Sequence, residues 1–352
     1  MKTGRTLTEL AQEIERQSNA KADYIAPSRQ LRIQSNGHTD LILDGESHEV
    51  NETAHQQIGE HVGIPRNYYQ RIREEHPELL DRNVNTLLQA RPETERRMVR
   101  TLDGRARAFL SDRYRRLDHY DLLDAVLPEL LGTEGLSLAS CDVTESKLYL
   151  KVQSTRLEAE VKKGDVVQMG LVVTNSEIGQ GGIKVEPYSV RLVCLNGMIH
   201  TDWGMRKNHV GRAALQVEGE GAYQYFADET LQADDRAFWL KVRDVVKGTL
   251  SERMLEQVVG QMREAAGIMI EGSIEKAVEV LGQRHGLNQT EQGSVLRNLI
   301  QGSDLSIWGL SNAVTATAGQ AETYDRASDL EALGGTIMAL PKNDLHALIA
   351  AR

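Results

Sequence analysis

The sequence predicts an α+β protein, in which an antiparallel sheet with a basic hairpin and helical insertions is followed by an all-helical C-terminal region. Three observations lead to this prediction. Apolar residues recur with a period of two through most of residues 95–201, they recur with helical spacing from residue 226 onward, and tight-turn dipeptides separate the candidate strands. The 352 residues suffice for about two domains, which we expect to be an α+β body, residues 1–212, and an acidic helical region, residues 213–352.

The first 95 residues predict one hairpin among helices. Asn36-Gly37 lies between two alternating runs, and this dipeptide is the strongest short signal for a hairpin turn. Thr6 is a suitable N-cap for the first helix, and Pro65 and Pro77 suit first-turn positions. The predicted segments are a helix over 7–19, a hairpin over 30–43, and helices over 51–61 and 65–89.

Seven strands are predicted between residues 95 and 201, interrupted by one helix over 120–131. Asp103-Gly104 and Gln180-Gly181-Gly182 predict tight hairpin turns. Cys194 falls in an apolar strand pattern and is expected to be a buried, inert thiol. The helical region that follows is divided by helix-breaking residues at Gly248, Gly272, Gly286, Gly302 and Pro341.

Composition excludes several classes of protein. Two cysteines cannot form a disulfide framework or a four-ligand zinc site, which is typical of a reducing compartment. The N-terminus lacks the apolar stretch of a secretory signal, and no run approaches the ~18 apolar residues of a membrane span. We therefore expect a cytoplasmic protein, located in the host cell if a phage encodes it, with no membrane partner.

The net charge of −10 argues against a polyanionic partner, but the charge is unevenly distributed. Residues 213–352 hold 12 Lys and Arg against 20 Asp and Glu, whereas the arginine segment, residues 96–116, holds eight arginines against two aspartates. If its two arms form a hairpin, Arg105 and Arg107 share a face, and guanidinium groups spaced ~6–7 Å apart suit a row of phosphates. The arginine segment is therefore the first candidate nucleic-acid interface, and the acidic region is a candidate cover for it.

Two further basic patches support this hypothesis. In the strand around residues 147–153, Lys147, Tyr149 and Lys151 alternate with apolar residues, a pattern typical of a charged stacking platform for bases. Arg206 and Lys207 begin a third patch. The candidate nucleic-acid-binding residues are Arg96, Arg97, Arg100, Arg105, Arg107, Arg113, Tyr114, Arg115, Arg116, Lys147, Tyr149, Lys151, Arg206 and Lys207.

Other interpretations of the same residues stay open. The arginines could form ion pairs with the many carboxylates of the chain or bind a small phosphorylated ligand, and the 147–153 pattern also fits any half-buried antiparallel strand. The glycine-rich stretches lack the spacing of a phosphate-binding loop. A metal-dependent site is a weaker alternative, built from the acidic and histidine residues of 40–55 or from Asn175, Glu177, His200 and Asp202. No catalytic residue, metal or cofactor is assigned.

Five strings resemble one known family: residues 100–123 (RTLDGRARAFLSDRYRRLDHYDLL), 173–199 (VTNSEIGQGGIKVEPYSVRLVCLNGMI), HVG at 209–211, GIPRNYYQRI at 63–72 and residues 310–335 (LSNAVTATAGQAETYDRASDLEALGG). They are similar to the phage- and plasmid-borne family called domain of unknown function 932. The resemblance implies a mobile genetic element and the contexts of DNA replication, recombination or evasion of host defence. A sheet with a basic hairpin is also similar, by analogy of fold, to phage single-strand annealing recombinases.

The sequence and the resemblance together predict a single-stranded DNA-binding protein, with strand annealing as one specific form of that activity. We expect it to form homo-oligomers. The alternatives are a metal-dependent enzyme acting on nucleic acid and a protein-binding factor that acts in host takeover or anti-defence.

Overall fold

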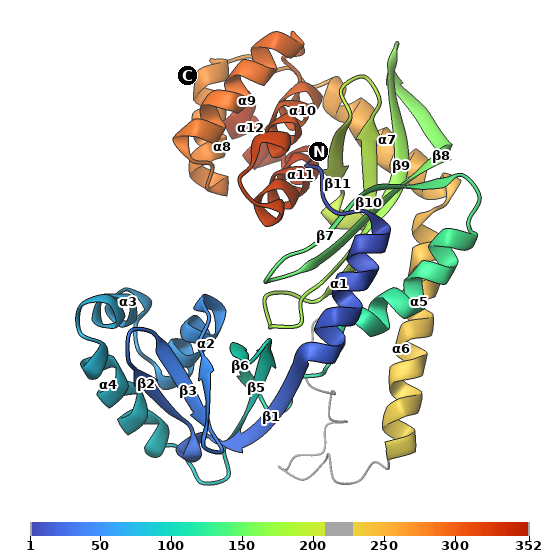
Figure 1. Cartoon of the computed structure of the whole chain (residues 1–352). Helices are drawn as coiled ribbons and strands as arrows, with labels where there is room; N and C mark the ends of the chain where they lie inside the picture. Colours follow the sequence, from blue (N-terminus) through green and yellow to red (C-terminus); the bar gives the residue numbers. More distant parts are fainter. Residues whose placement is uncertain (1, 208–227, 351–352) are drawn as a thin grey trace.

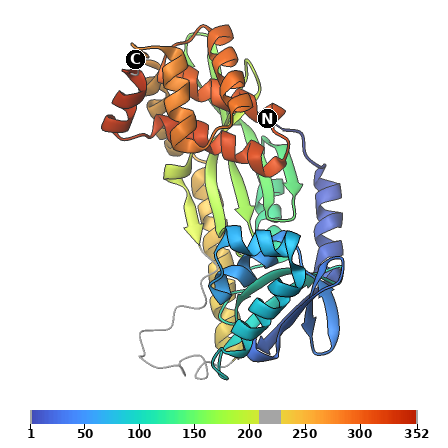
Figure 2. The same ribbon diagram turned by 90° about the vertical axis from the view of Figure 1, so that its left-hand side faces the viewer.

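The computed structural model describes residues 2–207 and 228–350, which form three tiers (Figures 1 and 2). The lowest tier is an N-terminal module, the middle tier is a six-stranded sheet with flanking helices, and the top tier is helical. The predicted α+β class, with helices following the strands, is confirmed. The predicted boundary at residue 212 lies outside the described residues.

The N-terminal module contains two small antiparallel sheets, ordered β1-β5-β6 and β2-β3-β4, and three helices. Its apolar core joins both sheets and the three helices, and it includes Leu41, Ile58, Ile72, Leu80 and Phe109. The elements are β1 Lys21–Pro27, β2 Arg32–Ser35, β3 Thr39–Leu43, β4 Glu46–Glu49, α2 Glu52–Val62, α3 Arg66–Glu75, α4 Pro77–Gln89, β5 Arg96–Leu102 and β6 Arg105–Ser111.

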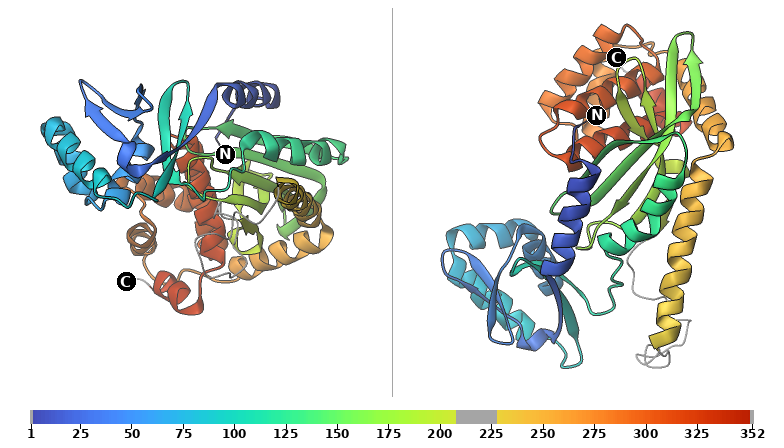
Figure 3. Two further views of the ribbon diagram at one scale, coloured as in Figure 1. Left: turned by 90° about the horizontal axis from the view of Figure 1, so that it is seen from below. Right: turned by 45° about the vertical axis from the view of Figure 1, so that its right-hand side comes forward.

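The middle tier is an antiparallel sheet ordered β11-β10-β9-β8-β7, with β12 added beside β10. Helices α1, α5 and α6 pack on one of its faces, as the two views of Figure 3 show. Their elements are α1 Leu7–Ala20, α5 His119–Gly132, β7 Leu136–Val143, β8 Leu148–Lys162, β9 Asp165–Asn175, β10 Ile183–Arg191, β11 Asn196–Ile199, β12 Met205–Lys207 and α6 Asp228–Thr249.

The top tier packs on the sheet too, with α11 on the face opposite α1, α5 and α6, so part of the sheet lies between two helical layers. Trp308 of α10 is buried against β9, where its indole Nε1 donates to Asp165 at 2.9 Å, and Arg191 binds the same carboxylate at 2.6 Å. The helices are α7 Glu252–Ala266, α8 Ile274–His285, α9 Gln289–Gly302, α10 Ile307–Thr317, α11 Tyr324–Met338 and α12 Lys342–Ile349.

Local turn chemistry was largely predictable. The hairpins at Asn36-Gly37 and Asp103-Gly104 are present, with positive φ at Gly37, Asp103 and Gly104. Two expectations are wrong. Gln180-Gly181-Gly182 does not form a tight turn, because residues 176–182 form a longer loop that packs on the N-terminal module. Cys194 is exposed in the turn between β10 and β11, and both cysteines are free thiols.

Candidate nucleic-acid interface

The structure divides the arginine segment into buried and exposed side chains. Arg100 is fully buried and Arg107 is 7% exposed. Arg97 and Arg115 are half-buried, the first against His61 and Glu95 and the second against Asp234 and the Phe238 ring of α6. Tyr114 is likewise half-buried, its hydroxyl donating to the Ser176 carbonyl. The exposed arginines are Arg96, Arg105, Arg113 and Arg116.

Arg100 is the centre of a buried ionic network that joins the N-terminal module to the middle tier. Its Nε donates to Asp23 of β1 at 2.8 Å, and its Nη2 donates to Asp118, the N-cap of α5, at 2.8 Å. Its Nη1 donates to the backbone carbonyl of Glu177 in the 176–182 loop at 3.0 Å. Burial would lower the pKa of the guanidinium, but the two carboxylates raise it above its ordinary value.

Arg107 binds the side chain of Glu177, which is also buried. The Glu177 Oε2 accepts from Arg107, and its Oε1 accepts the backbone N–H of His119 at 2.7 Å. Burial alone would raise the pKa of the Glu177 carboxyl, but its interactions with His119 and the charge of Arg107 hold that pKa below its ordinary value. The first turn of α5 adds a favourable helix dipole. We call Asp23, Arg100, Arg107, Asp118 and Glu177 the junction network.

The junction network corrects the expectation of an arginine row facing phosphates. Arg105 and Arg107 do not share an exposed face, because a bulge opposite Arg100 and Thr101 breaks the alternation of β6. Arg105 forms an exposed pair with Glu49, whereas Arg107 is turned inward. For Arg100 and Arg107, ion pairing with carboxylates of this chain is what the structure shows.

The platform expected on the 147–153 strand is also covered. Leu148, Leu150 and Val152 face the α1, α5 and α6 layer, as the alternation predicts, but the opposite face of β8 packs under α11 instead of facing solvent. The Lys151 Nζ donates to Glu331 Oε2 at 2.7 Å and to Ser328 Oγ at 2.9 Å.

The rest of this buried site is aromatic. The Tyr149 hydroxyl donates to Asp325 of α11 at 2.7 Å, and the rings of Tyr149, Tyr188 and Tyr324 lie 4.6–6.0 Å from the Lys151 ammonium. Lys151 is 1% exposed and Glu331 is fully buried. Tyr149 and Lys151 therefore cannot stack or pair with nucleic acid while α11 occupies this position, because the acidic region covers them.

A third set of cations lies at one end of the strands of the middle sheet. Antiparallel pairing places Arg206 of β12 directly beside Lys184 of β10, so both lie on one face. Lys207 pairs with Ile183, which is buried against the α1, α5 and α6 layer, so Lys207 lies on the opposite face. Lys147 precedes β8, whose first residue pairs with Asn175 at the end of β9. We call Lys147, Lys184, Arg206 and Lys207 the basic strand-end cluster.

The pKa values of two carboxyl groups reflect the nearby charges of three of these cations. Burial raises the pKa of Asp329 on α11, and the charges of Lys147 and Lys184 oppose that rise. Burial likewise raises the pKa of Glu186, opposed by Lys184 and Arg206. In the sequence, Lys147 belongs to one predicted patch, Arg206 and Lys207 belong to another, and Lys184 belongs to neither. Only the strand order brings these residues together.

The candidate metal groups do not assemble. Glu177 is held in the junction network, and buried His200 bonds to Ser189 Oγ at 2.9 Å while Asp202 is exposed. Within residues 2–207 and 228–350, no group of three or more His, Cys, Asp or Glu side chains is placed to hold a metal ion. Among the same residues, no helix is long and apolar enough to cross a membrane.

Buried histidines predict a pH-dependent stability. Burial lowers the pKa of His55, His61 and His119 to about 4 and that of His200 to about 3, whereas an unfolded histidine titrates near 6.5. Below pH 6.5 the unfolded chain therefore binds protons that the folded chain does not. We expect the free energy of unfolding to fall between pH 6.5 and 4, by on the order of 3 kcal/mol for each fully buried histidine.

Urea unfolding at pH 7.5, 6 and 4.5 measures this dependence. His200→Gln should flatten part of the slope, while His76→Gln serves as the control because His76 is exposed. Equal stability of the unsubstituted protein at pH 7.5 and 4.5 would contradict the assignment of neutral buried histidines.

The fold and the site define a class: an α+β protein with a sheet between helices and a basic cluster at the strand ends, in which Arg206 and Lys207 are exposed and Lys147 and Lys184 are half-buried. Residues 107–337, more than half of the chain, match the family described as Domain of unknown function (DUF932). The chain belongs to this family, as the resemblance implied. Comparison with curated proteins and with solved structures finds no match.

Proposed function

We propose that this protein binds single-stranded DNA at the basic strand-end cluster. The observation that supports this proposal is that Lys147, Lys184 and Arg206 meet at one end of the strands, with Lys207 on the opposite face of β12. Neighbouring strands lie ~4.8 Å apart and alternate residues ~6–7 Å apart, so the cluster suits successive phosphates of a flexible strand. Lys207 is exposed and forms no ion pair with a described residue.

An exposed aromatic residue adds a stacking surface to the cluster. Trp203 precedes β12, is 38% exposed and lies within about 13 Å of Lys207 along the extended chain. A cationic groove with an aromatic ring is the usual combination for binding single strands without sequence preference, since every base offers a π face. Arg113 is also exposed and adjoins Tyr114, whose hydroxyl bonds to the 176–182 loop between β9 and β10.

Fluorescence anisotropy with a labelled oligo-dT tests the proposal. We expect a slope of log affinity against log salt of about −2.8, from about 0.7 per phosphate at four contacts. The triple variant Lys184→Ala, Arg206→Ala, Lys207→Ala should reduce the slope by about 2 and weaken binding at least tenfold at low salt.

The control removes three exposed cations elsewhere: Arg156→Ala, Lys163→Ala, Arg253→Ala. It should bind as the unsubstituted chain does. Equal loss in the two triple variants would mean that total charge, and not the cluster, governs binding. Absence of binding at low salt would reject the function.

Two more specific parts of the proposal, strand annealing and the formation of homo-oligomers, are tested separately. Strand annealing is measured by mixing complementary oligonucleotides, and homo-oligomers by native mass spectrometry with and without oligo-dT. We further propose that a phage or plasmid encodes the protein and that the protein acts in the cytoplasm of the host cell.

A further inference from the structure

Helices α2 and α3 of the N-terminal module form a second feature that the proposed function does not use. α2 ends and α3 begins within three residues, Gly63-Ile64-Pro65. Gly63 has φ +75°, which ends α2 in the left-handed region, and the Ile64 N–H donates to the Gly59 carbonyl at 2.9 Å. Two helices joined by a short turn that contains glycine are the connection of a helix-turn-helix.

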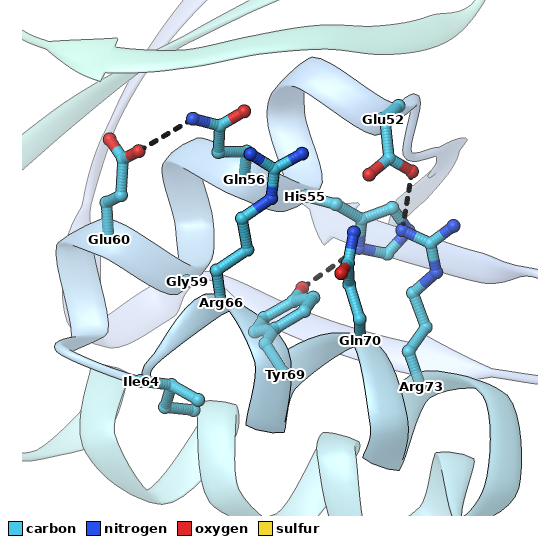
Figure 4. Close-up of a pocket in the computed structure, with 10 residues that line it drawn as sticks. All are labelled: Glu52, His55, Gln56, Gly59, Glu60, Ile64, Arg66, Tyr69, Gln70 and Arg73. Atoms are coloured by element: carbon cyan, nitrogen blue, oxygen red, sulfur yellow. Dashed lines mark hydrogen bonds and ion pairs between the residues drawn. The ribbon is translucent and has the colours of Figure 1, made fainter. Parts of the chain in front are cut away.

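The two helices are fixed against each other by close packing. A Cβ on Gly59 would lie 3.0 Å from the Tyr69 ring, so a larger residue there would push α3 away from α2. Tyr69 and Ile72 are buried, and the Tyr69 hydroxyl bonds to the buried His55 Nδ1 at 2.9 Å. Figure 4 shows Tyr69 and His55 between the helices, with Arg73 paired to Glu52 at 2.8 Å beside them. α3 therefore has one fixed orientation.

The surface of α3 carries side chains of the types that recognise DNA. Asn67, Tyr68 and Arg71 are exposed on the side away from α2. Arg66 is exposed and Gln70 half-buried, and both line the pocket between α3 and α2, as Figure 4 shows. α3 carries three arginines, of which Arg73 pairs with Glu52, and its two acidic residues are the last two, Glu74 and Glu75. Arg binds guanine, and Asn or Gln binds adenine, through paired hydrogen bonds in the major groove. The Arg71 guanidinium lies 5.6 Å from the Tyr68 ring centroid, which limits its freedom before binding.

We propose that α3 is a recognition helix that enters the major groove of double-stranded DNA. Ten residues form a helix about 15 Å long, and a helix fits the groove, which is about 12 Å wide. Arg66 begins α3, where the N-terminal end of the helix dipole also favours a phosphate. This surface lies outside the family match at 107–337 and is distinct from the basic strand-end cluster.

The test measures binding of the full chain to a labelled mixed-sequence duplex of 24 base pairs at low salt. Arg66→Ala, Arg71→Ala should weaken binding about tenfold or more and reduce the salt slope by up to about 1.8. The matched control is Arg29→Ala, Arg32→Ala, which removes two exposed arginines of the same module away from α3. Asn67→Ala and Gln70→Ala should change which sequences are enriched from a randomised duplex pool.

The outcome separates the two DNA-binding proposals. The α3 variant should keep its affinity for oligo-dT, and the triple variant of the basic strand-end cluster should keep its affinity for the duplex. The inference is overturned if the unsubstituted chain does not bind the duplex, if the two arginine pairs lose affinity equally, or if the α3 variant loses single-stranded binding to the same extent.

Discussion

Replacing Arg100 with methionine is expected to lower the free energy of unfolding by about 3 kcal/mol, because it removes the fully buried cation between two carboxylates and leaves them Lys21 and the more exposed Arg116 as ion-pair partners. Arg100 is fully buried and binds Asp23, Asp118 and the Glu177 carbonyl at 2.8–3.0 Å. Methionine fills a similar volume but donates no hydrogen bond. The three oxygens would keep their burial and lose their common donor, and the midpoint of urea unfolding measures the cost.

The same hairpin supplies the control for this variant. Arg105 pairs with Glu49 at 2.9 Å, but the two side chains are 50% and 44% exposed. Arg105→Ala should change the free energy of unfolding by at most about 1 kcal/mol, as is usual for a surface ion pair. The double variant Arg100→Met, Asp23→Asn should recover part of the loss, since it removes one of the two carboxylate charges. If Arg105→Ala costs as much as Arg100→Met, burial of the network is not the cause.

Arg100 and Arg105 also show how far the sequence could predict the site. Alternation and Asp103-Gly104 correctly predict the hairpin that contains both, because these signals act over a few residues. Burial of Arg100 depends on Asp118 and on Glu177, which is 77 residues away in the chain. Local sequence patterns carry no information about such contacts, so they predict that the arginine segment lies on the surface.

The middle sheet shows that contacts between residues far apart in the chain can both remove and create a candidate interface. The two faces of β8 follow from alternation alone, yet nothing near Lys151 in the chain indicates that Glu331, 180 residues later, covers it. Conversely, Lys147 and Arg206 belonged to separate patches until the order β8-β9-β10-β12 placed them with Lys184 at one end of these strands. Packing of α11 thus removed one candidate interface, and strand order assembled another.

Replacing Lys151 with methionine is expected to cost about 3–5 kcal/mol, because it leaves the fully buried Glu331 carboxylate without its cation. The remaining partners cannot compensate, since Glu331 Oε1 already has no hydrogen bond. Lys151→Met, Glu331→Leu removes both charges and should recover most of the loss, as paired apolar replacements of buried ion pairs often do. A coupling energy of about 2 kcal/mol or more in this double-mutant cycle would show that the charges, and not the packed volume, carry the effect.

Arg156→Ala on the same strand is the control, because its pair with Glu134 is 62% and 81% exposed. A double variant as unstable as Lys151→Met alone would contradict this account. If the charges do carry the effect, the acidic region covers the β8 face as a structural partner, and Lys151 belongs to the core that holds the helical tier to the sheet.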